Sequence, residues 1–310
     1  MAAKRILLIA NPASGQHRGE RRLAQASERL ASLGHAVTAT LTESAGHATR
    51  LAKSNAPDFE IIAALGGDGT VNEVANGLMA VEPGERPALA TLPVGTGNDV
   101  ALTYGLAHFE SAIDALAKGS TRTLDVIRVQ LMRDGKSVTR HALLFVAAGF
   151  AAEVIRKTGP RVKRIFGRRF SYSVGLFRAL ASFRAPEFSV KWDGGETSGR
   201  MFQVCAGNTE FAAGGVMRIS PGARPDDGLL NISLVDALGR LQIVRRFPSI
   251  LSGRYVEDER VDYFTGKRLE NDALPPAEVH ADGDIIGTTP ATIELLPGTL
   301  KLVVHDQFQV

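Results

Sequence analysis

The sequence predicts two domains: an α/β N-terminal domain on a parallel sheet, over residues 1–128, and a C-terminal antiparallel β-sandwich, over residues 129–310. From residue 4 to about 128, short apolar runs alternate with helical spacing, which is typical of a parallel sheet covered on both faces. After about residue 130, short strand-like runs separated by turn residues dominate. A chain of 310 residues is long enough for two cores. The last few residues are candidates for a return to the first domain.

In the first domain, buried-type strands and amphipathic helices are expected to follow one another. The predicted strands are Arg5–Ala10, Ala36–Leu41, Ile61–Leu65, Ala88–Leu92 and Thr123–Val129. The predicted helices lie between them, at Arg18–Leu33, Ala45–Ser54, Thr70–Ala80 and Phe109–Lys118. In the helix near Thr70, for example, Val71, Val74 and Leu78 share one face.

In the second domain, turn residues such as Asp227-Gly228 and Pro297-Gly298 separate the predicted strands. These strands are Glu187–Trp192, Met201–Ala206, Leu229–Val235, Glu278–Ala281, Ala291–Leu295 and Leu300–Val304. One or two helices are expected near residues 150–183 and 239–252. Because no long flexible linker is evident, the two domains are expected to pack closely and form a cleft.

Glycine-rich turns follow three strands of the first domain. The central one, Gly66-Gly67-Asp68-Gly69-Thr70, leads directly into a helix, and similar turns lie at residues 11–15 and 92–99. Glycine allows the backbone to approach a ligand closely, and the N-terminus of a helix favours a phosphate. One such turn alone is equally well explained as a tight connection. Two of them at the carboxyl ends of neighbouring strands favour a ligand site. Asn98 or Asp99 is expected to cap the helix that follows the second turn.

These turns resemble the signatures of the diacylglycerol kinase catalytic domain. The matching residues are Asn11-Pro12-x-Ser14-Gly15, the run from Gly66 to Val74, and Leu92-Pro93-x-Gly95-Thr96-x-Asn98-Asp99. Chain length and motif order are similar to bacterial lipid kinases of the YegS and DgkB type, which are relatives of sphingosine kinases. The Gly-Gly-Asp-Gly-Thr core is shared with NAD kinases and phosphofructokinase-like enzymes, whereas Val71-Asn72-Glu73-Val74 is more specific. The resemblance spans nearly the whole chain and implies a Rossmann- or phosphofructokinase-like first domain.

A kinase must hold ATP, neutralise phosphate charge and orient an attacking hydroxyl. The sequence has no P-loop and no lysine between residues 66 and 72, so backbone amides plus a metal are expected to hold the phosphates. Asp68 is expected to contact the ribose, or else to orient its own loop. The resemblance implies that Thr42 contacts ATP, whereas the sequence alone indicates only an ordinary threonine at the end of a strand. The predicted ATP-binding residues are Thr42, Gly66, Gly67, Asp68, Gly69, Thr70, Val71, Asn72, Thr96 and Asn98.

The predicted catalytic residues lie far away in the sequence, at His280-Ala281-Asp282-Gly283-Asp284. In an extended strand, the side chains of residues 280, 282 and 284 would share one face. The alternative is a hairpin turn on Asp282-Gly283 with solvated acids. The resemblance favours catalysis, because the family carries Asp-Gly-Glu here and its first acid is the proposed general base. Asp282 is therefore the expected base toward a lipid hydroxyl. Asp284 replaces the glutamate with a side chain shorter by one bond and is the second predicted catalytic residue. His280 is expected to be an ordinary strand residue.

The segment from Arg224 to Leu229 resembles the Mg²⁺-binding segment of the family. Asp227 is the matched carboxylate, and Leu229 and Arg224 would contribute main-chain oxygens. The side chain of Arg224 would not take part, because a guanidinium cannot ligate a cation. Hard cations prefer such oxygen ligands. The alternative is an ordinary Asp-Gly hairpin turn.

A basic segment, residues 156–169, is followed by Phe170 and contains seven arginines and lysines without an acid. Such a segment suits an anionic membrane surface, so peripheral membrane contact through residues 156–170 is one interpretation and a solvated basic face is the other. The longest apolar stretch, Ala142–Ala152, is too short to span a bilayer. Any membrane contact is therefore expected to be peripheral, and no signal peptide is evident.

Composition places few further limits on partners. The net charge of +3 is slight and gives no reason to expect a nucleic-acid partner. The single cysteine, Cys205, excludes an intrachain disulfide and suits a reducing cytoplasm, so a cytoplasmic location is expected, with contact at the inner face of the membrane as an option. The oligomeric state is open, with a homodimer among the options.

The sequence thus predicts an ATP- and Mg²⁺-dependent kinase that phosphorylates a hydroxyl of a membrane lipid such as diacylglycerol, phosphatidylglycerol or a sphingoid base. One alternative is a kinase of the NAD kinase type with a soluble acceptor. The other is a nucleotide-binding regulatory protein without turnover, which the departures at Asp284 and Arg224 keep open.

Overall fold

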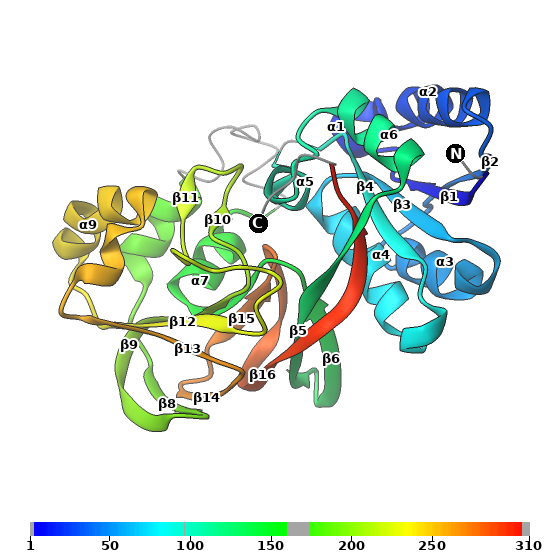
Figure 1. Cartoon of the computed structure of the whole chain (residues 1–310). Coiled ribbons are helices and arrows are strands. Elements are labelled where there is room, and N and C mark those ends of the chain that lie inside the picture. Colours follow the sequence, from blue (N-terminus) through cyan, green and yellow to red (C-terminus); the bar gives the residue numbers. More distant parts are fainter. Residues whose placement is uncertain (1–2, 96, 160–173, 306–310) are drawn as a thin grey trace.

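The computed structural model describes residues 3–95, 97–159 and 174–305 of the chain (Figure 1). In the N-terminal half, four strands pair in parallel in the order β2-β1-β3-β4. Their bounds are β1 Arg5–Ala10, β2 Ala36–Leu41, β3 Ile61–Gly66 and β4 Ala88–Pro93. β1 and β2 have the predicted bounds, and β3 and β4 each continue one residue further.

Helices cover both faces of this sheet (Figure 1). Alternate strand residues enter two separate cores: Ile6 and Leu8 pack on the same side as Leu30, whereas Leu7 and Ile9 pack with Leu78. Helices α2 (Gly19–Ser32) and α6 (Phe109–Lys118) cover the first side, and α3 (His47–Asn55) and α4 (Asp68–Met79) cover the second. The shorter helices of this half are α1 (Ser14–His17), η1 (Ala56–Asp58), η2 (Pro83–Glu85) and α5 (Asp99–Thr103).

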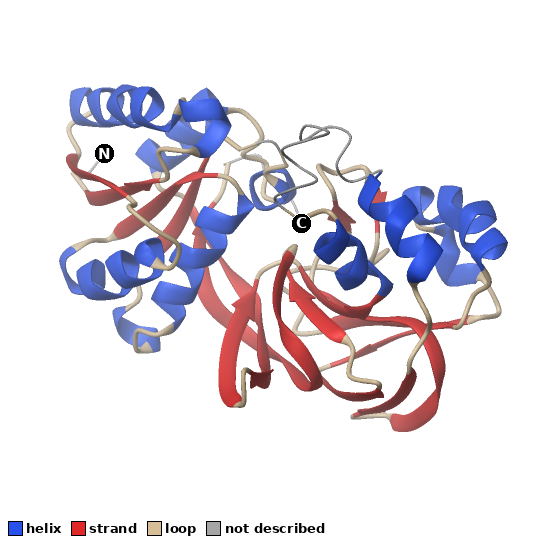
Figure 2. Cartoon of the chain, turned by 180° about the vertical axis from the view of Figure 1, so that it is seen from behind, coloured by secondary structure: helices blue, strands red, loops and turns tan. Residues whose placement is uncertain are grey.

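The C-terminal half is rich in antiparallel strands (Figure 2). Apolar side chains such as Val129, Phe188, Leu230, Leu269 and Val279 form its main core. The strand bounds are β5 Thr121–Arg133, β6 Lys136–Ala142, β7 Phe145–Gly149, β8 Glu187–Trp192, β9 Gly195–Gly207, β10 Phe211–Ala212, β11 Met217–Arg218, β12 Leu230–Asp236, β13 Val261–Gly266, β14 Arg268–Leu274, β15 Glu278–Ala281 and β16 Asp284–Val303. The helical residues are α7 Phe150–Lys157, residues 174–182, α9 Arg240–Ser252 and η3 Arg254–Glu257.

One sheet continues through both halves of the molecule. β16 pairs antiparallel with β5, and near its end Leu302 lies opposite Leu89 of β4 in parallel. The C-terminal strand therefore reaches the N-terminal sheet, and the two long strands β5 and β16 connect the halves in Figure 1.

Several elements differ from the sequence prediction. The expected helix from Arg18 to Leu33 corresponds to α2, which is one residue shorter at each end, and the short helix α1 precedes it. Helix α4 begins at Asp68, inside the expected turn. The two expected strands at Ala291–Leu295 and Leu300–Val304 are parts of β16, except for Val304, and the pairing of β16 with β5 shifts in register between them. Strands β6, β7, β10, β11, β13 and β14 were not predicted. In β14, charged residues occupy alternate exposed positions, so the apolar signal is weak.

Candidate functional site

The three glycine-rich turns lie against one another at the carboxyl ends of β1, β3 and β4. A Cβ atom at Gly95 would lie 2.5 Å from the Cα atom of Gly67, so the second and central turns touch through their backbones. A Cβ atom at Gly15 would lie 2.4 Å from the carbonyl oxygen of Val94, which brings in the first turn. Glycine is required at Gly15 and Gly95 because the backbones approach so closely.

The first turn of α4 already uses two of its amides. The N–H groups of Thr70 and Val71 both donate to the carbonyl of Gly67, at 2.9 and 3.2 Å. The Val71 side chain is buried in the core, and the Thr70 side chain packs over Gly66. The amides of Gly67, Asp68 and Gly69 precede the first acceptor inside the helix. Among the amides from Gly66 to Asn72, which the sequence suggests for the ATP phosphates, those of Thr70 and Val71 are therefore already used within the turn.

Asp68 orients the neighbouring turn. Its carboxylate accepts the N–H of Val100 at 3.1 Å, in the first turn of α5, and burial raises the pKa of this carboxyl. Asn98, the residue before α5, has φ +55° and makes no side-chain capping bond; its amide donates to the Gly95 carbonyl at 3.0 Å. The expected cap of α5 by Asn98 or Asp99 is thus supplied by Asp68 instead. Thr96 lies outside the described residues.

Thr42 lies just past the end of β2, at the same edge of the sheet as the glycine-rich turns. Its backbone N–H donates to the Ala10 carbonyl at 2.8 Å. Its side chain is half-buried.

Asp282 belongs to the second domain, but its side chain contacts the first. Its carboxylate accepts the side-chain amide of Asn72 at 3.0 Å and the backbone N–H groups of Leu143, Leu144 and Phe145 at 2.8, 3.0 and 3.1 Å. Burial raises the pKa of Asp282 to about 6, although these donors favour the charged form. Four donors match the roughly four lone-pair directions of a carboxylate, so this side chain is fully hydrogen-bonded.

The expected extended strand through residues 280–284 was wrong. Ala281 pairs with Asp284 across a two-residue turn, in which Asp282 and Gly283 have φ of +47° and +88°. The chain reverses here, so the three polar side chains do not share one strand face. His280 is buried, packs edge-on against Phe145 with ring centroids 5.5 Å apart, and has a pKa lowered by burial to about 4.

Asp284 lies beside the central glycine-rich turn. Its carboxylate oxygen Oδ2 would lie 3.9 Å from a Cβ atom at Gly69, and the residue is exposed. The hairpin therefore brings Asp282 and Asp284 to different parts of α4: Asp282 to Asn72, and Asp284 to Gly69.

Asn76 is a site residue that the sequence analysis missed. Its side-chain amide donates to the carbonyl of His141 and accepts the N–H of His141, both at 2.9 Å. Asn72 donates to the same carbonyl at 3.2 Å, so α4 is joined to the end of β6 by side-chain amides. The spacing of Asn72 and Asn76, four residues apart on one helix face, was the available signal.

Asp99 makes a second contact between the halves. Its carboxylate accepts the N–H of Gly214 at 2.6 Å, in the loop between β10 and β11. Ala213, Gly214 and Gly215 have consecutive φ values of +57°, +73° and +77°, and successive N–H groups of such a segment can face one anion. Burial, and then the charge of Asp68, raise the pKa of Asp99.

The predicted metal residues lie in a turn held by Asp125. Asp125 was also missed; its buried carboxylate accepts the N–H groups of Gly228 and Gly298 at 2.8 and 2.7 Å. Asp227 is exposed and accepts the N–H of Leu229 at 3.0 Å, as in an ordinary Asp-Gly turn. The Arg224 guanidinium lies 3.6 Å from Asp226.

This turn offers oxygen donors of the kind that Mg²⁺ prefers, but it does not form a complete cage. Within residues 3–95, 97–159 and 174–305, no three His, Cys, Asp or Glu side chains gather around one point. Burial raises the pKa of Asp227, and the charges of Asp125 and Asp226 raise it further, which a bound cation would counteract. The residues therefore fit a metal that keeps several of its ligands as water or phosphate.

Only the beginning of the basic segment 156–169 can be described; residues 160–170 lie outside the described part. Arg156 bonds to Glu153 and lies 3.0 Å from Glu278, and Lys157 lies 3.5 Å from Glu153. These two charges face acids rather than an open surface. Across the described chain, no helix is both long and apolar enough to cross a bilayer.

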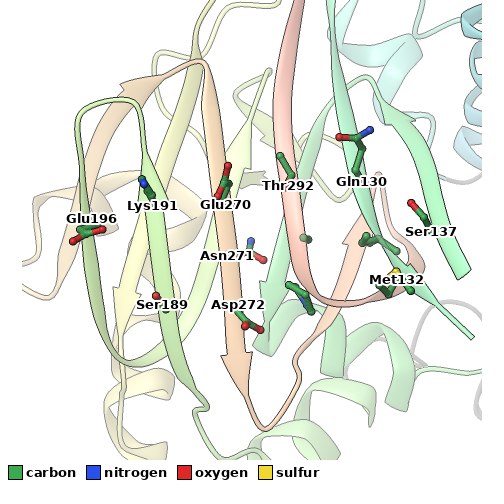
Figure 3. Close-up of a pocket in the computed structure, with 13 residues that line it drawn as sticks. Gln130, Met132, Ser137, Ser189, Lys191, Glu196, Glu270, Asn271, Asp272 and Thr292 are labelled. Atoms are coloured by element: carbon green, nitrogen blue, oxygen red, sulfur yellow. The ribbon is translucent and has the colours of Figure 1, made fainter. Parts of the chain in front are cut away.

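A cavity of about 440 Å³ lies elsewhere, on the β-rich half (Figure 3). Its walls come from β5, β6, β8, β9, β14 and β16, and include Lys191, Glu270 and Asp272. None of the predicted site residues lines it.

Two family models match the chain. Residues 5–129 match the diacylglycerol kinase catalytic domain, and residues 144–304 match the YegS C-terminal NAD kinase beta sandwich-like domain. A diacylglycerol kinase of Bacillus subtilis is 28% identical over 292 residues, covering 93% of this chain and 92% of that protein. One of Staphylococcus aureus is 28% identical over 290 residues, covering 93% and 88%. A crystal structure of a diacylglycerol kinase from Bacillus anthracis has a TM-score of 0.75 at 25% identity, covering 99% of this chain and 98% of that one.

Proposed function

The chain belongs to the family that joins a diacylglycerol kinase catalytic domain to a YegS-type C-terminal domain, and on that premise we propose that it is an ATP-dependent kinase acting on a lipid hydroxyl. The contact of the Asp282-Gly283-Asp284 hairpin with the first turns of α4 carries this proposal. Acceptors of the right chemistry are diacylglycerol, phosphatidylglycerol and sphingoid bases.

The ATP phosphates are proposed to lie at the N-terminus of α4. The amides of Gly67, Asp68 and Gly69 are the donors without an acceptor inside the helix, and the helix dipole favours negative charge there. Gly66 and Thr70 shape this turn, and Asn98 and Asp68 order the adjacent one. Thr42 and Thr96 remain predicted ATP contacts.

We assign the proton acceptor to Asp284 rather than to Asp282. All four lone-pair directions of Asp282 are used, so it would have to release a hydrogen bond to take a proton from the acceptor hydroxyl. Asp284 is exposed beside Gly69, where the γ-phosphate would lie. In the proposed step, Asp284 takes the hydroxyl proton as the lipid oxygen bonds to the γ-phosphorus and ADP leaves. Asp282 positions the hairpin that carries Asp284.

Mg²⁺ is proposed as the metal, with Asp227 and the main-chain oxygens of Leu229 and Arg224 as its protein ligands. When bound it would neutralise negative charge near the phosphates.

The assignment is tested with radiolabelled ATP and a total lipid extract, followed by identification of the labelled lipid. We expect Asp284→Asn to lower the turnover rate about 10²–10⁴-fold, with a smaller loss of stability than in Asp282→Asn because residue 284 is exposed. Asp282→Asn should lower both activity and stability, since an amide can accept only two of the four hydrogen bonds.

Full activity in Asp284→Asn with loss only in Asp282→Asn would return the base to Asp282. Labelled NADP in place of labelled lipid would identify a kinase of the NAD kinase type. ATP binding without transfer to any lipid or to NAD would indicate a regulatory protein.

A further inference from the structure

Helix α9 (Arg240–Ser252) has an apolar outer face that no other described part of the protein covers. Leu241 is 62% exposed, Val244 53% and Leu251 39%, whereas Ile243 is buried on the opposite side. Positions 241, 244, 248 and 251 follow helical spacing, so these side chains form one stripe along the helix. The apolar residues are therefore arranged on both sides of α9, and only the inner side has a partner in the fold.

The outer face also carries one arginine, Arg245. The helix contains three arginines and no acid. Arg246, toward the inner side, pairs with Asp258 at 2.5 Å. Arg245 is exposed beside Val244 and lies on the outer face. A positive charge next to exposed apolar side chains is the composition of helices that lie on anionic bilayers.

Neighbouring elements extend this face. The Arg240 guanidinium donates to the carbonyl of Ala181 at 2.6 Å, so the start of α9 lies beside the helical residues 174–182, where Phe177 is 69% exposed. At the other end of α9, Gly253 packs against the Arg218 side chain of β11. Val216, in the loop that leads into β11, is also exposed. Figure 1 shows α9 and β11 at the same end of the molecule.

The β10–β11 loop also connects this face to the candidate active site. Gly214 of that loop binds Asp99, two residues before the exposed Val216. A surface that binds this face would therefore lie near the contact of Asp99 with the β10–β11 loop.

We propose that the face formed by Phe177, Val216, Leu241, Val244, Arg245 and Leu251 docks on an anionic lipid bilayer. The proposal rests on the proposed lipid-kinase function, because the acceptor would be drawn from that bilayer. An anionic bilayer accepts apolar side chains and neutralises arginine at the same time. A second copy of α9, related by two-fold symmetry, would offer Arg245 no acid, because the helix contains none.

The test is co-sedimentation of the full-length protein with phosphatidylcholine vesicles that contain or lack phosphatidylglycerol. We expect binding to the anionic vesicles only, at least about tenfold weaker binding of Leu241→Ser/Val244→Ser, and weaker, less salt-dependent binding of Arg245→Glu. A matched control, Leu33→Ser/Met132→Ser, removes exposed apolar side chains from other surfaces and should bind like the unaltered protein.

Equal binding of the α9 variant and the unaltered protein would overturn the proposal, as would equal binding to neutral and anionic vesicles. A dimer in sedimentation velocity that Leu241→Ser/Val244→Ser dissociates would identify the face as an interface between copies instead. Phosphate transfer to a detergent-dispersed lipid should be the same in the variant and the unaltered protein. If neither transfers phosphate, the kinase function fails, while the vesicle result still decides the docking face.

Discussion

The glycine-rich turns of the N-terminal half and the Asp282-Gly283 hairpin of the C-terminal half form one site in different ways. The turns touch through backbone, and their contacts, Gly95 against Gly67 and Gly15 against Val94, all lie within the N-terminal half. The hairpin is held by side-chain bonds to residues more than 130 positions away. The contacts among the turns thus require glycines, which have no side chain, whereas the position of the hairpin depends on the single carboxylate of Asp282.

The difference indicates where each region is sensitive. Close backbone contact is lost when a side-chain atom is added to the glycine. The hydrogen bonds of a buried carboxylate are lost when its charge or its number of acceptor oxygens changes. The first kind of site should respond to the size of a substituent, and the second to pH and to hydrogen-bonding capacity.

The largest effect is expected for the way in which Asp282→Asn changes the pH dependence of the free energy of unfolding. The folded protein raises the pKa of Asp282 from 3.8 to about 6, so it binds this proton more tightly than the unfolded chain does. The stability contributed by this proton is complete below pH 4 and is lost as the pH rises through 6. At about 1.4 kcal/mol for each change of one in pKa, the loss is about 3 kcal/mol.

Urea unfolding of both proteins at pH 4 to 7.5 measures this. The difference in unfolding free energy between the unaltered protein and the variant should change with pH by that amount, since all other groups cancel. A difference that is independent of pH would show that the Asp282 environment does not penalise its charge.

The next effect separates two glycines in contact. Gly95→Ala places a methyl group 2.5 Å from the Gly67 backbone and should cost about 1–3 kcal/mol of stability, with weaker ATP binding. Gly67→Ala is its matched control for stability, because its own Cβ would be 3.4 Å from Gly95 and its backbone is extended, as alanine allows. Thermal unfolding compares the stability of the two variants, and calorimetric ATP titration measures the affinity of Gly95→Ala against the unaltered protein. Equal stability of the two variants would mean that backbone contact does not define the turn cluster.

The smallest effect concerns the contact between α4 and β6. Asn76→Ala removes two hydrogen bonds to the backbone of His141 and should destabilise the protein by about 1–2 kcal/mol. Asn55→Ala removes a hydrogen bond from a side-chain amide to the Leu51 carbonyl within one helix, and it should cost less stability. The comparison uses urea unfolding. A larger loss in Asn55→Ala would show that the contact between the halves adds little.

The sequence predicted the N-terminal elements well because their signals are local. Each buried strand is a continuous apolar run, and each helix repeats its apolar residues at helical spacing; β1, β2 and α6 have the predicted bounds. Strands such as β14 and β6, which carry charged side chains on their exposed face, were missed for lack of such a run. The glycine-rich turns and the acidic hairpin were both found as motifs.

What the sequence determined by itself is the composition of the site: small residues where backbones must meet, and acids beside a tight turn. Tertiary structure alone decided how those acids are used. Whether a carboxylate is buried under four donors or exposed beside a helix N-terminus depends on segments distant in sequence. The solvation and hydrogen bonding that set its chemistry exist only after those segments have packed together.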